Sequence, residues 1–270
     1  MASAVIPRQR SGIITLLTDF GTTDAFVGVM KGVILGINRR AQLVDLTHEV
    51  PAHDVEAAAF VLATAYRFFP TGTVHVVVVD PGVGSERRAI AVAAGGQLFV
   101  APDNGVLSYV FLHEPTFMAW AIARREFCLS EVSATFHGRD VFAPVAAHLS
   151  LGVAPDELGP SVTAVVRAKV PEPILAEKSA RGQVVYFDRF GNAITNLPRN
   201  LMGSAPSSGE MTVCVGRHEI RGLVECYEQG EAGSPIALWG SCGYLEIAVP
   251  RGSARELLGL VKGQEVVVQW

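Results

Sequence analysis

One carboxylate and two guanidinium groups follow a run of valines, and this pattern could perform or support chemistry. Asp80 comes directly after residues 74–79, and Arg87 and Arg88 follow it by seven and eight positions. An arginine beside a carboxylate favours the ionised form of that carboxylate, so this pair could be a catalytic element. An ion pair that holds a loop is the alternative, and this segment alone does not decide between them.

Two more acids occupy the same position relative to an apolar segment. Asp19 comes just after residues 12–17, and Asp103 just after residues 97–101. Ligands of open α/β sheets bind at the carboxyl ends of the strands, so Asp19, Asp80 and Asp103 are candidates to line one pocket. Aspartate is also common in turns, which is a sufficient explanation for any one of them. Their shared position favours a site.

His137 is a further candidate, within the short stretch FHGRD at residues 136–140. Histidine titrates near neutral pH and can accept or relay a proton, although a surface role is the alternative. The apolar run at residues 141–150 predicts a helix that follows this stretch, with Asp140 as its cap.

Two polar stretches near the C-terminus could contact a ligand. They read DRFGNAITN at residues 188–196 and GSCGYLEIAVPRGSA at residues 240–254. Both are too rich in Gly, Asn and Ser to predict a core strand, and both carry aromatic side chains that could stack on a flat ring. Hairpin turns in a β domain are the alternative.

Composition and missing motifs exclude several functions. Basic residues are few and scattered in a chain of net charge −4, which argues against nucleic acid as a partner. Phosphate-binding and dinucleotide glycine motifs are absent, as are GxSxG and HExxH, so a serine hydrolase or zinc peptidase is not expected. The four cysteines show no metal-ligand spacing, which predicts no metal site and buried free thiols. With no signal segment and no membrane span, the sequence predicts a cytoplasmic protein.

The elements that must position these residues form an α/β pattern in the first part of the chain. Apolar and β-branched runs predict strands at residues 12–17, 42–46, 73–79, 89–93, 97–101 and 116–124. Helical spacing predicts helices at residues 26–37, 55–69, 106–112 and 141–150. We therefore expect an N-terminal α/β domain over residues 1–168, with a central, mostly parallel sheet.

The pattern changes after a proline-containing stretch, which we interpret as a linker over residues 169–181. Beyond it, short runs of period two predict a smaller all-β, barrel-like domain over residues 182–270, with one short helix at residues 253–258. Its strands are expected at residues 182–187, 211–215, 219–223, 235–239, 244–249 and 265–269.

Six motifs in order, from about residue 13 to residue 260, resemble those of the S-adenosyl-L-methionine (SAM) hydroxide adenosyltransferase family, hydrolases related to the fluorinase and chlorinase. They are LTDFGTTDAFVGVMKGVI, VVDPGVGSERR, VAPDNGVL, FHGRDVFAP, DRFGNAITN and SCGYLEIAV. The resemblance implies an α/β domain with a β-barrel domain, a homotrimer with active sites between subunits, and cleavage of SAM by water to adenosine and L-methionine. It places the family's catalytic trio on Asp80, Arg87 and His137 and implies no cofactor.

The resemblance also implies substrate contacts. Asp19 would bind the ribose hydroxyls, Asn192 the adenine edge and Asp188 the methionine ammonium group. Ser241 would meet the carboxylate or amine region of methionine, with Glu246 and Val249 as further contacts. Halogenating relatives have an arginine where this chain has Cys242. A halide-dependent adenosyltransferase that makes 5′-halo-5′-deoxyadenosine, and a non-catalytic adenosine- or SAM-binding protein, are the alternative functions.

Overall fold

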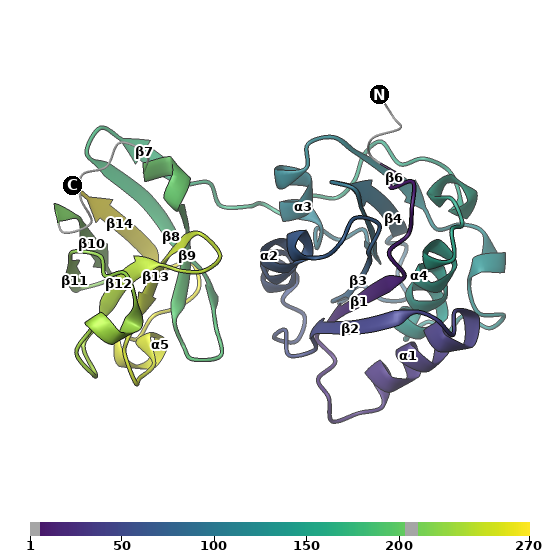
Figure 1. Ribbon diagram of the computed structural model, residues 1–270, viewed down its shortest axis with the longest axis horizontal. Coiled ribbons are helices and arrows are strands. Elements are labelled where there is room, and N and C mark those ends of the chain that lie inside the picture. Colours follow the sequence, from purple (N-terminus) through teal and green to yellow (C-terminus); the bar gives the residue numbers. More distant parts are fainter. Residues whose placement is uncertain (1–5, 203–209) are drawn as a thin grey trace. The chain divides into compact units, whose positions relative to one another are not determined.

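Two units, residues 1–169 and residues 170–270, each fold around a sheet of their own (Figure 1). The computed structural model describes residues 6–202 and 210–270, so the first five residues of the expected N-terminal domain lie outside the described part. Within the described part, no helix combines the length and the apolar character needed to cross a membrane.

A six-stranded mixed sheet organises the first unit, in the order β2-β1-β3-β5-β4-β6. Its strands are β1 (Ile13–Thr18), β2 (Gln42–Thr47), β3 (Val74–Val78), β4 (Ala89–Ala94), β5 (Gln97–Pro102) and β6 (Phe117–Ala121). The pairings β1–β2, β1–β3 and β3–β5 are parallel, whereas β4 runs antiparallel to β5 and β6. All five residues of β3 are buried, as expected for a valine-rich strand covered on both faces.

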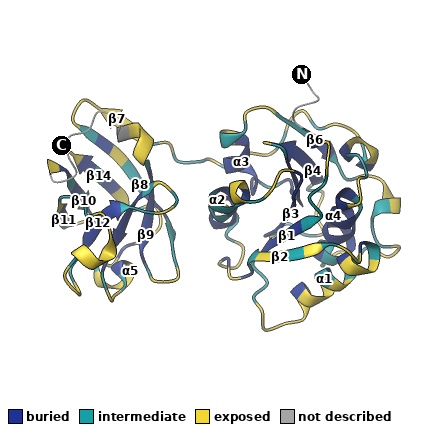
Figure 2. Cartoon of the chain, viewed as in Figure 1, coloured by how far each residue is buried: buried dark blue, intermediate teal, exposed yellow. Residues whose placement is uncertain are grey.

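Helices cover this sheet, and most of its strands are buried, whereas β2 is largely accessible (Figure 2). The helices are α1 (Phe26–Ile37), α2 (Val55–Ala65), α3 (Ser108–His113) and α4 (Ala143–Ser150). Met30 and Ile34 of α1 and Val145 of α4 share one buried cluster with Leu16 and Val76 of the strands. The predicted α/β architecture is confirmed, and the parallel strands β1 and β3 present their carboxyl ends at one edge.

The residues before α4 differ from the sequence prediction. Gly138–Phe142 form a π-helical turn, η4, that continues directly into α4. Asp140 is fully buried inside this turn, where it accepts a hydrogen bond from the backbone N–H of Ser133 at 2.8 Å and pairs with Arg139. The prediction that Asp140 caps the helix was wrong because helical backbone starts earlier, in a stretch without apolar periodicity.

The second unit is an antiparallel sheet that curls into a nearly closed barrel. Its strands are β7 (Ile174–Ala176), β8 (Ser179–Phe187), β9 (Ala193–Pro198), β10 (Thr212–Val215), β11 (His218–Arg221), β12 (Ile236–Trp239), β13 (Tyr244–Ala248) and β14 (Glu265–Gln269). The order is β11-β10-β14-β8-β9-β13-β12, with β7 beside β8. A bridge between Val224 and Leu238 ties the chain after β11 to the opposite edge strand, β12. The expected barrel-like domain is thus present, with the short helix α5 (Ala254–Leu257) between β13 and β14.

Two details of this unit differ from the sequence expectation. Strand β7 and the start of β8 fall within residues 169–181, where a linker was expected. Strand β9 is a buried central strand, although residues 188–196 were judged too polar for one. Its polar side chains tolerate burial because they have partners: Thr195 Oγ1 donates to the carbonyl of Leu245 at 2.8 Å, and Asn196 Nδ2 to that of Pro171 at 2.9 Å.

The cysteines are free, as predicted, but they are not buried. Cys226 is exposed, and Cys128, Cys214 and Cys242 are partly exposed. Cys128 packs against the buried cluster of the first unit, and burial raises the pKa of its thiol.

Candidate active site

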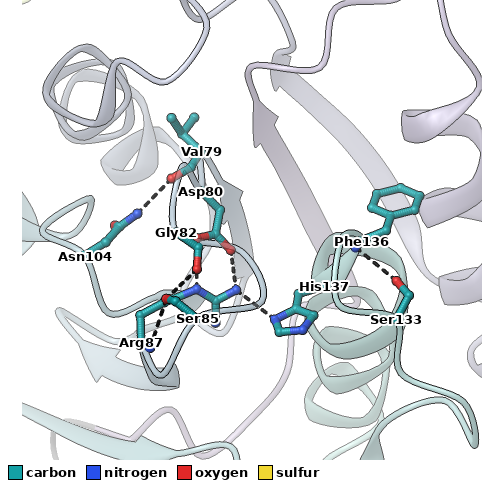
Figure 3. Close-up of polar contacts among 9 residues, drawn as sticks. All are labelled: Val79, Asp80, Gly82, Ser85, Arg87, Asn104, Ser133, Phe136 and His137. Carbon is teal, nitrogen blue, oxygen red and sulfur yellow. Dashed lines mark hydrogen bonds and ion pairs between the residues drawn. The ribbon is translucent and has the colours of Figure 1, made fainter.

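The guanidinium group of Arg87 contacts both other members of the expected trio, Asp80 and His137 (Figure 3). Arg87 Nε donates to Asp80 Oδ1 at 2.9 Å, and Arg87 Nη2 donates to Asp80 Oδ2. The same Nη2 lies 2.8 Å from Nδ1 of His137, which is 50 residues further along the chain. Only 5% of the Asp80 side chain and 10% of the Arg87 side chain are exposed, so the fork between them is largely shielded from water.

A tight loop after β3 positions Asp80 and Arg87. The backbone N–H of Val83 donates to the carbonyl of Asp80 at 3.1 Å, and Ser85 donates to Gly82 with both its N–H and its hydroxyl. Gly84 has φ +79°, and a Cβ there would lie 2.3 Å from the carbonyl oxygen of Ala134. Only glycine fits this position, which brings the loop against the segment that carries His137.

Hydrogen bonds within residues 133–140 position His137. Asp140 accepts from the N–H of Ser133, and Ser133 Oγ accepts from the N–H of Phe136 at 3.0 Å. Because a guanidinium group can only donate, Nδ1 of His137 accepts the bond from Arg87 and the ring proton resides on Nε2. Burial, and then the positive charge of Arg87, lower the pKa of His137, while nearby carboxylates oppose the shift. The ring is therefore neutral at neutral pH.

Asp80 and His137 face a pocket of about 330 Å³. Its wall comprises Asp19, Phe20, Phe26, Ala52, His53, Val78, Asp80, Val83, Thr135, Phe136, His137 and Gly138. Two acids, Asp19 and Asp80, thus share one cavity at the carboxyl ends of β1 and β3. The carboxylate of Asp19 is held in place because its Oδ2 accepts the backbone N–H of His53 at 2.8 Å.

The pocket also has an aromatic wall that the sequence analysis did not predict. The rings of Phe20, Phe26 and Phe136 pack tilted or edge to face, with centroids 5.2 to 5.8 Å apart. Two of them stand beside residues that were identified, because Phe20 follows Asp19 and Phe136 precedes His137. His53 was also missed, and its φ of +65° has no signal in a single sequence.

Asp103, the third acid expected at this pocket, has another role. Its Oδ2 accepts from Arg88 Nε at 2.9 Å, and its Oδ1 accepts from the N–H of Val166 at 2.8 Å. It is not among the residues that line the pocket. Its neighbour Asn104 donates to the carbonyl of Val79 at 2.9 Å, next to Asp80 (Figure 3). This end of β5 therefore braces the loop instead of facing the cavity.

The substrate-contact candidates of the second unit form two polar clusters. Asp188 accepts from the side-chain amide of Asn192 at 2.9 Å and from its backbone N–H at 2.8 Å, which closes the turn between β8 and β9. Glu246 on β13 is buried and accepts from the hydroxyl of Tyr227 at 2.6 Å. Burial raises the pKa of Glu246, and burial with the neighbouring Glu246 raises that of Tyr227.

The other two candidates in this unit differ in accessibility. Ser241 is exposed in the turn between β12 and β13. Val249 is 3% exposed and belongs to the hydrophobic core of the barrel. In the described part of the chain, no three His, Cys, Asp or Glu side chains gather in a way that could hold a metal ion.

The chain is similar to known proteins over nearly its whole length. Residues 14–159 match the model of the SAM hydroxide adenosyltransferase N-terminal domain, and residues 182–267 match that of the C-terminal domain. An (R)-S-adenosyl-L-methionine hydrolase from Thermus thermophilus is 42% identical over 94% of this chain and 98% of its own length.

Two further comparisons extend this similarity. The crystal structure of a conserved protein from Thermotoga maritima superposes with a TM-score of 0.90 at 38% identity, covering 95% of this chain and all of the other. A fluorinase from Actinoplanes sp. is more distant, with 26% identity over 90% of this chain and 92% of the fluorinase.

Proposed function

Because the chain belongs to the SAM hydroxide adenosyltransferase family, we propose that it hydrolyses SAM to adenosine and L-methionine. The observation that carries this proposal is the contact of Arg87 with both Asp80 and His137 at the wall of a pocket. A carboxylate and a neutral imidazole, both held by one cation, are suited to orient and deprotonate a water molecule.

The proposed reaction is a displacement at C5′ of the substrate. The oxygen of water forms a bond to C5′, the bond between C5′ and the sulfonium sulfur breaks, and its electron pair stays on sulfur as the neutral thioether of methionine. One proton leaves the attacking water. Since the leaving group is neutral, the reaction needs no general acid and no cofactor, and activation and alignment of the water are the main tasks of the site.

The trio divides these tasks. Arg87 orients the carboxylate of Asp80 through two hydrogen bonds, and the remaining lone pairs of the carboxylate can accept a hydrogen bond from water. His137 is neutral because burial and Arg87 lower its pKa, which makes it competent to take a proton. Asp80 and His137 are both candidate proton acceptors, and Arg87 is the orienting cation.

The residues proposed to contact the rest of the substrate follow from the family resemblance. Asp19 at the pocket would accept hydrogen bonds from the ribose hydroxyls, which suits a carboxylate that faces a vicinal diol. The contacts proposed in the second unit are Asp188, Asn192, Ser241, Glu246 and Val249.

A homotrimer with active sites between subunits belongs to this proposal, and light scattering after size-exclusion chromatography measures the oligomer. A cytoplasmic location is supported by the four free thiols.

The experiment that tests this function uses SAM in water enriched in heavy oxygen. Hydrolysis predicts that adenosine and methionine form in equal amounts and that heavy oxygen enters the 5′-hydroxyl of adenosine. Chloride and fluoride are added in parallel reactions, because the fluorinase relative makes the halide reaction the second candidate. A 5′-halonucleoside as the main product, or calorimetric binding of SAM without any methionine release, would contradict hydrolysis.

A further inference from the structure

A buried threonine and a buried histidine contact each other at the base of the loop that contains Asp19. Thr18 ends β1, and its Oγ1 lies 2.9 Å from Nδ1 of His48, the residue that follows β2. Thr18 is 0% exposed and His48 is 5% exposed. The lining of the pocket includes Asp19 and Phe20 but neither Thr18 nor His48. This pair therefore contacts the loop of the site without lining the pocket itself.

The direction of each bond follows from the donors that are available. Nε2 of His48 lies 3.0 Å from Asp45 Oδ1, a carboxylate oxygen that can only accept, and this favours the tautomer with the ring proton on Nε2. In that tautomer Nδ1 accepts a hydrogen bond from Thr18 Oγ1, which itself accepts the backbone N–H of Phe20 at 3.2 Å. Asp45 in turn pairs with Lys31 at 2.6 Å. A chain of polar contacts thus connects the surface with the strand end that precedes Asp19.

His48 also holds the far end of the same loop. Its backbone carbonyl accepts the N–H of Gly21 at 2.8 Å, and Gly21 has φ +66°, a backbone conformation that favours glycine. The two residues between these anchors are Asp19 and Phe20, and both line the pocket. One residue, His48, therefore fixes the loop on both sides of the carboxylate.

We infer that Thr18 and His48 are positioning residues that fix Asp19 for the ribose of the substrate. This inference rests on the proposed function, because it assumes that a nucleoside occupies the pocket. A carboxylate that accepts hydrogen bonds from two neighbouring hydroxyls must keep its place and orientation. Loss of the Thr18 hydroxyl would leave His48 Nδ1 buried without its donor and would free the N–H of Phe20. The effect is on substrate binding, since neither residue reaches the trio.

Thr18→Val tests the inference, because it removes the hydroxyl at nearly constant volume. It should raise KM for SAM about tenfold and leave kcat within about twofold. Thr18→Ser, which keeps the hydroxyl, should retain the wild-type KM. The matched control is Thr15→Val on the same strand, since Thr15 Oγ1 makes a similar buried contact of 2.7 Å with Nδ1 of His75, a histidine that does not line the pocket. Thr15→Val should lower the melting temperature without changing KM.

Equal KM values for Thr18→Val and Thr18→Ser would overturn the inference, as would an equal rise in KM for Thr15→Val. If Thr18→Val does not fold, His48→Asn and His48→Leu replace it, because asparagine keeps an acceptor near the position of Nδ1 and leucine does not. Of these two variants, only His48→Leu should raise KM for SAM. Calorimetric binding of adenosine gives the same comparisons without turnover, so failure of hydrolysis and failure of the positioning role are separate outcomes.

Discussion

Nη2 of Arg87 lies 2.8 Å from Nδ1 of His137, so one guanidinium group holds both side chains that could take a proton from water. The contact joins the loop after β3 to the turn before α4, two elements that are remote in the sequence. It also fixes the imidazole tautomer, because arginine can only donate. Arg87 is therefore the structural centre of the proposed trio, although it contributes no base of its own.

Replacement of Arg87 tests whether its planar shape matters beyond its charge. Lysine keeps the positive charge but cannot form the fork on Asp80 and also reach His137. We expect Arg87→Lys and Arg87→Met to lower kcat for adenosine release at least about 100-fold, with similar losses for the two. Arg88→Lys is the matched control, because Arg88 pairs with Asp103 outside the pocket lining. Wild-type turnover by Arg87→Lys would show that charge alone is sufficient.

The pH dependence of the reaction should reflect the environment of His137. Burial and Arg87 lower its pKa below the ordinary value of 6.5, and the neutral ring is the form that can accept a proton. The value of kcat/KM should therefore be constant above pH 6.5 and fall as the pH drops through the lowered pKa.

Removal of Arg87 should shift this titration in a defined direction. Without the positive charge, the protonated ring is less disfavoured, so Arg87→Met should raise the pKa of His137. Nuclear magnetic resonance titration of the histidine rings measures both values, and His137→Gln identifies the signal. An unchanged pKa in Arg87→Met would mean that burial alone causes the shift.

Gly84→Ala should damage both stability and activity. The new Cβ would meet the carbonyl oxygen of Ala134 at 2.3 Å, and φ is +79°. Gly12→Ala is a matched control, because Gly12 has the same φ of +79° but no atom within 4 Å of a new Cβ. Both variants share the backbone strain, and only Gly84→Ala adds the clash that moves the loop with Asp80 and Arg87. Thermal unfolding and kcat measure the two effects, and equal values for both variants would contradict this explanation.

The sequence predicted the helices and strands better than the contacts between side chains. Apolar periodicity placed α1 at residues 26–37, and the valine run placed β3, because burial of one helix face or of a whole strand leaves a direct pattern. Periodicity could not predict the role of Asp103, because the sequence pattern of an acid at a strand end is the same whether the acid faces a cavity or pairs with an arginine. β9 was missed because its buried polar residues are stabilised by partners such as Leu245, which lies 50 positions from Thr195.

The contact between Arg87 and His137 shows the same limit. No periodicity or spacing connects positions 50 residues apart, so the trio was reached through family motifs and its geometry only through the structure. The aromatic wall of the pocket depends likewise on three elements that meet only in the fold.

Asp80→Asn separates the chemical step from substrate binding. The substitution keeps the size of the side chain and an acceptor oxygen, but it removes the charge that polarises water and half of the ion pair with Arg87. We expect kcat to fall about 100-fold to 1000-fold while SAM still binds, because catalysis by a positioned base contributes on this scale. Single-turnover formation of adenosine measures the chemical step, and calorimetry measures binding. Asp103→Asn is the matched control, because it makes the same Asp-to-Asn change at a carboxylate that holds a loop and does not line the pocket. If Asp80→Asn turned over SAM at the wild-type rate, His137 alone would have to activate the water, and the role of the Asp80–Arg87 pair would be structural.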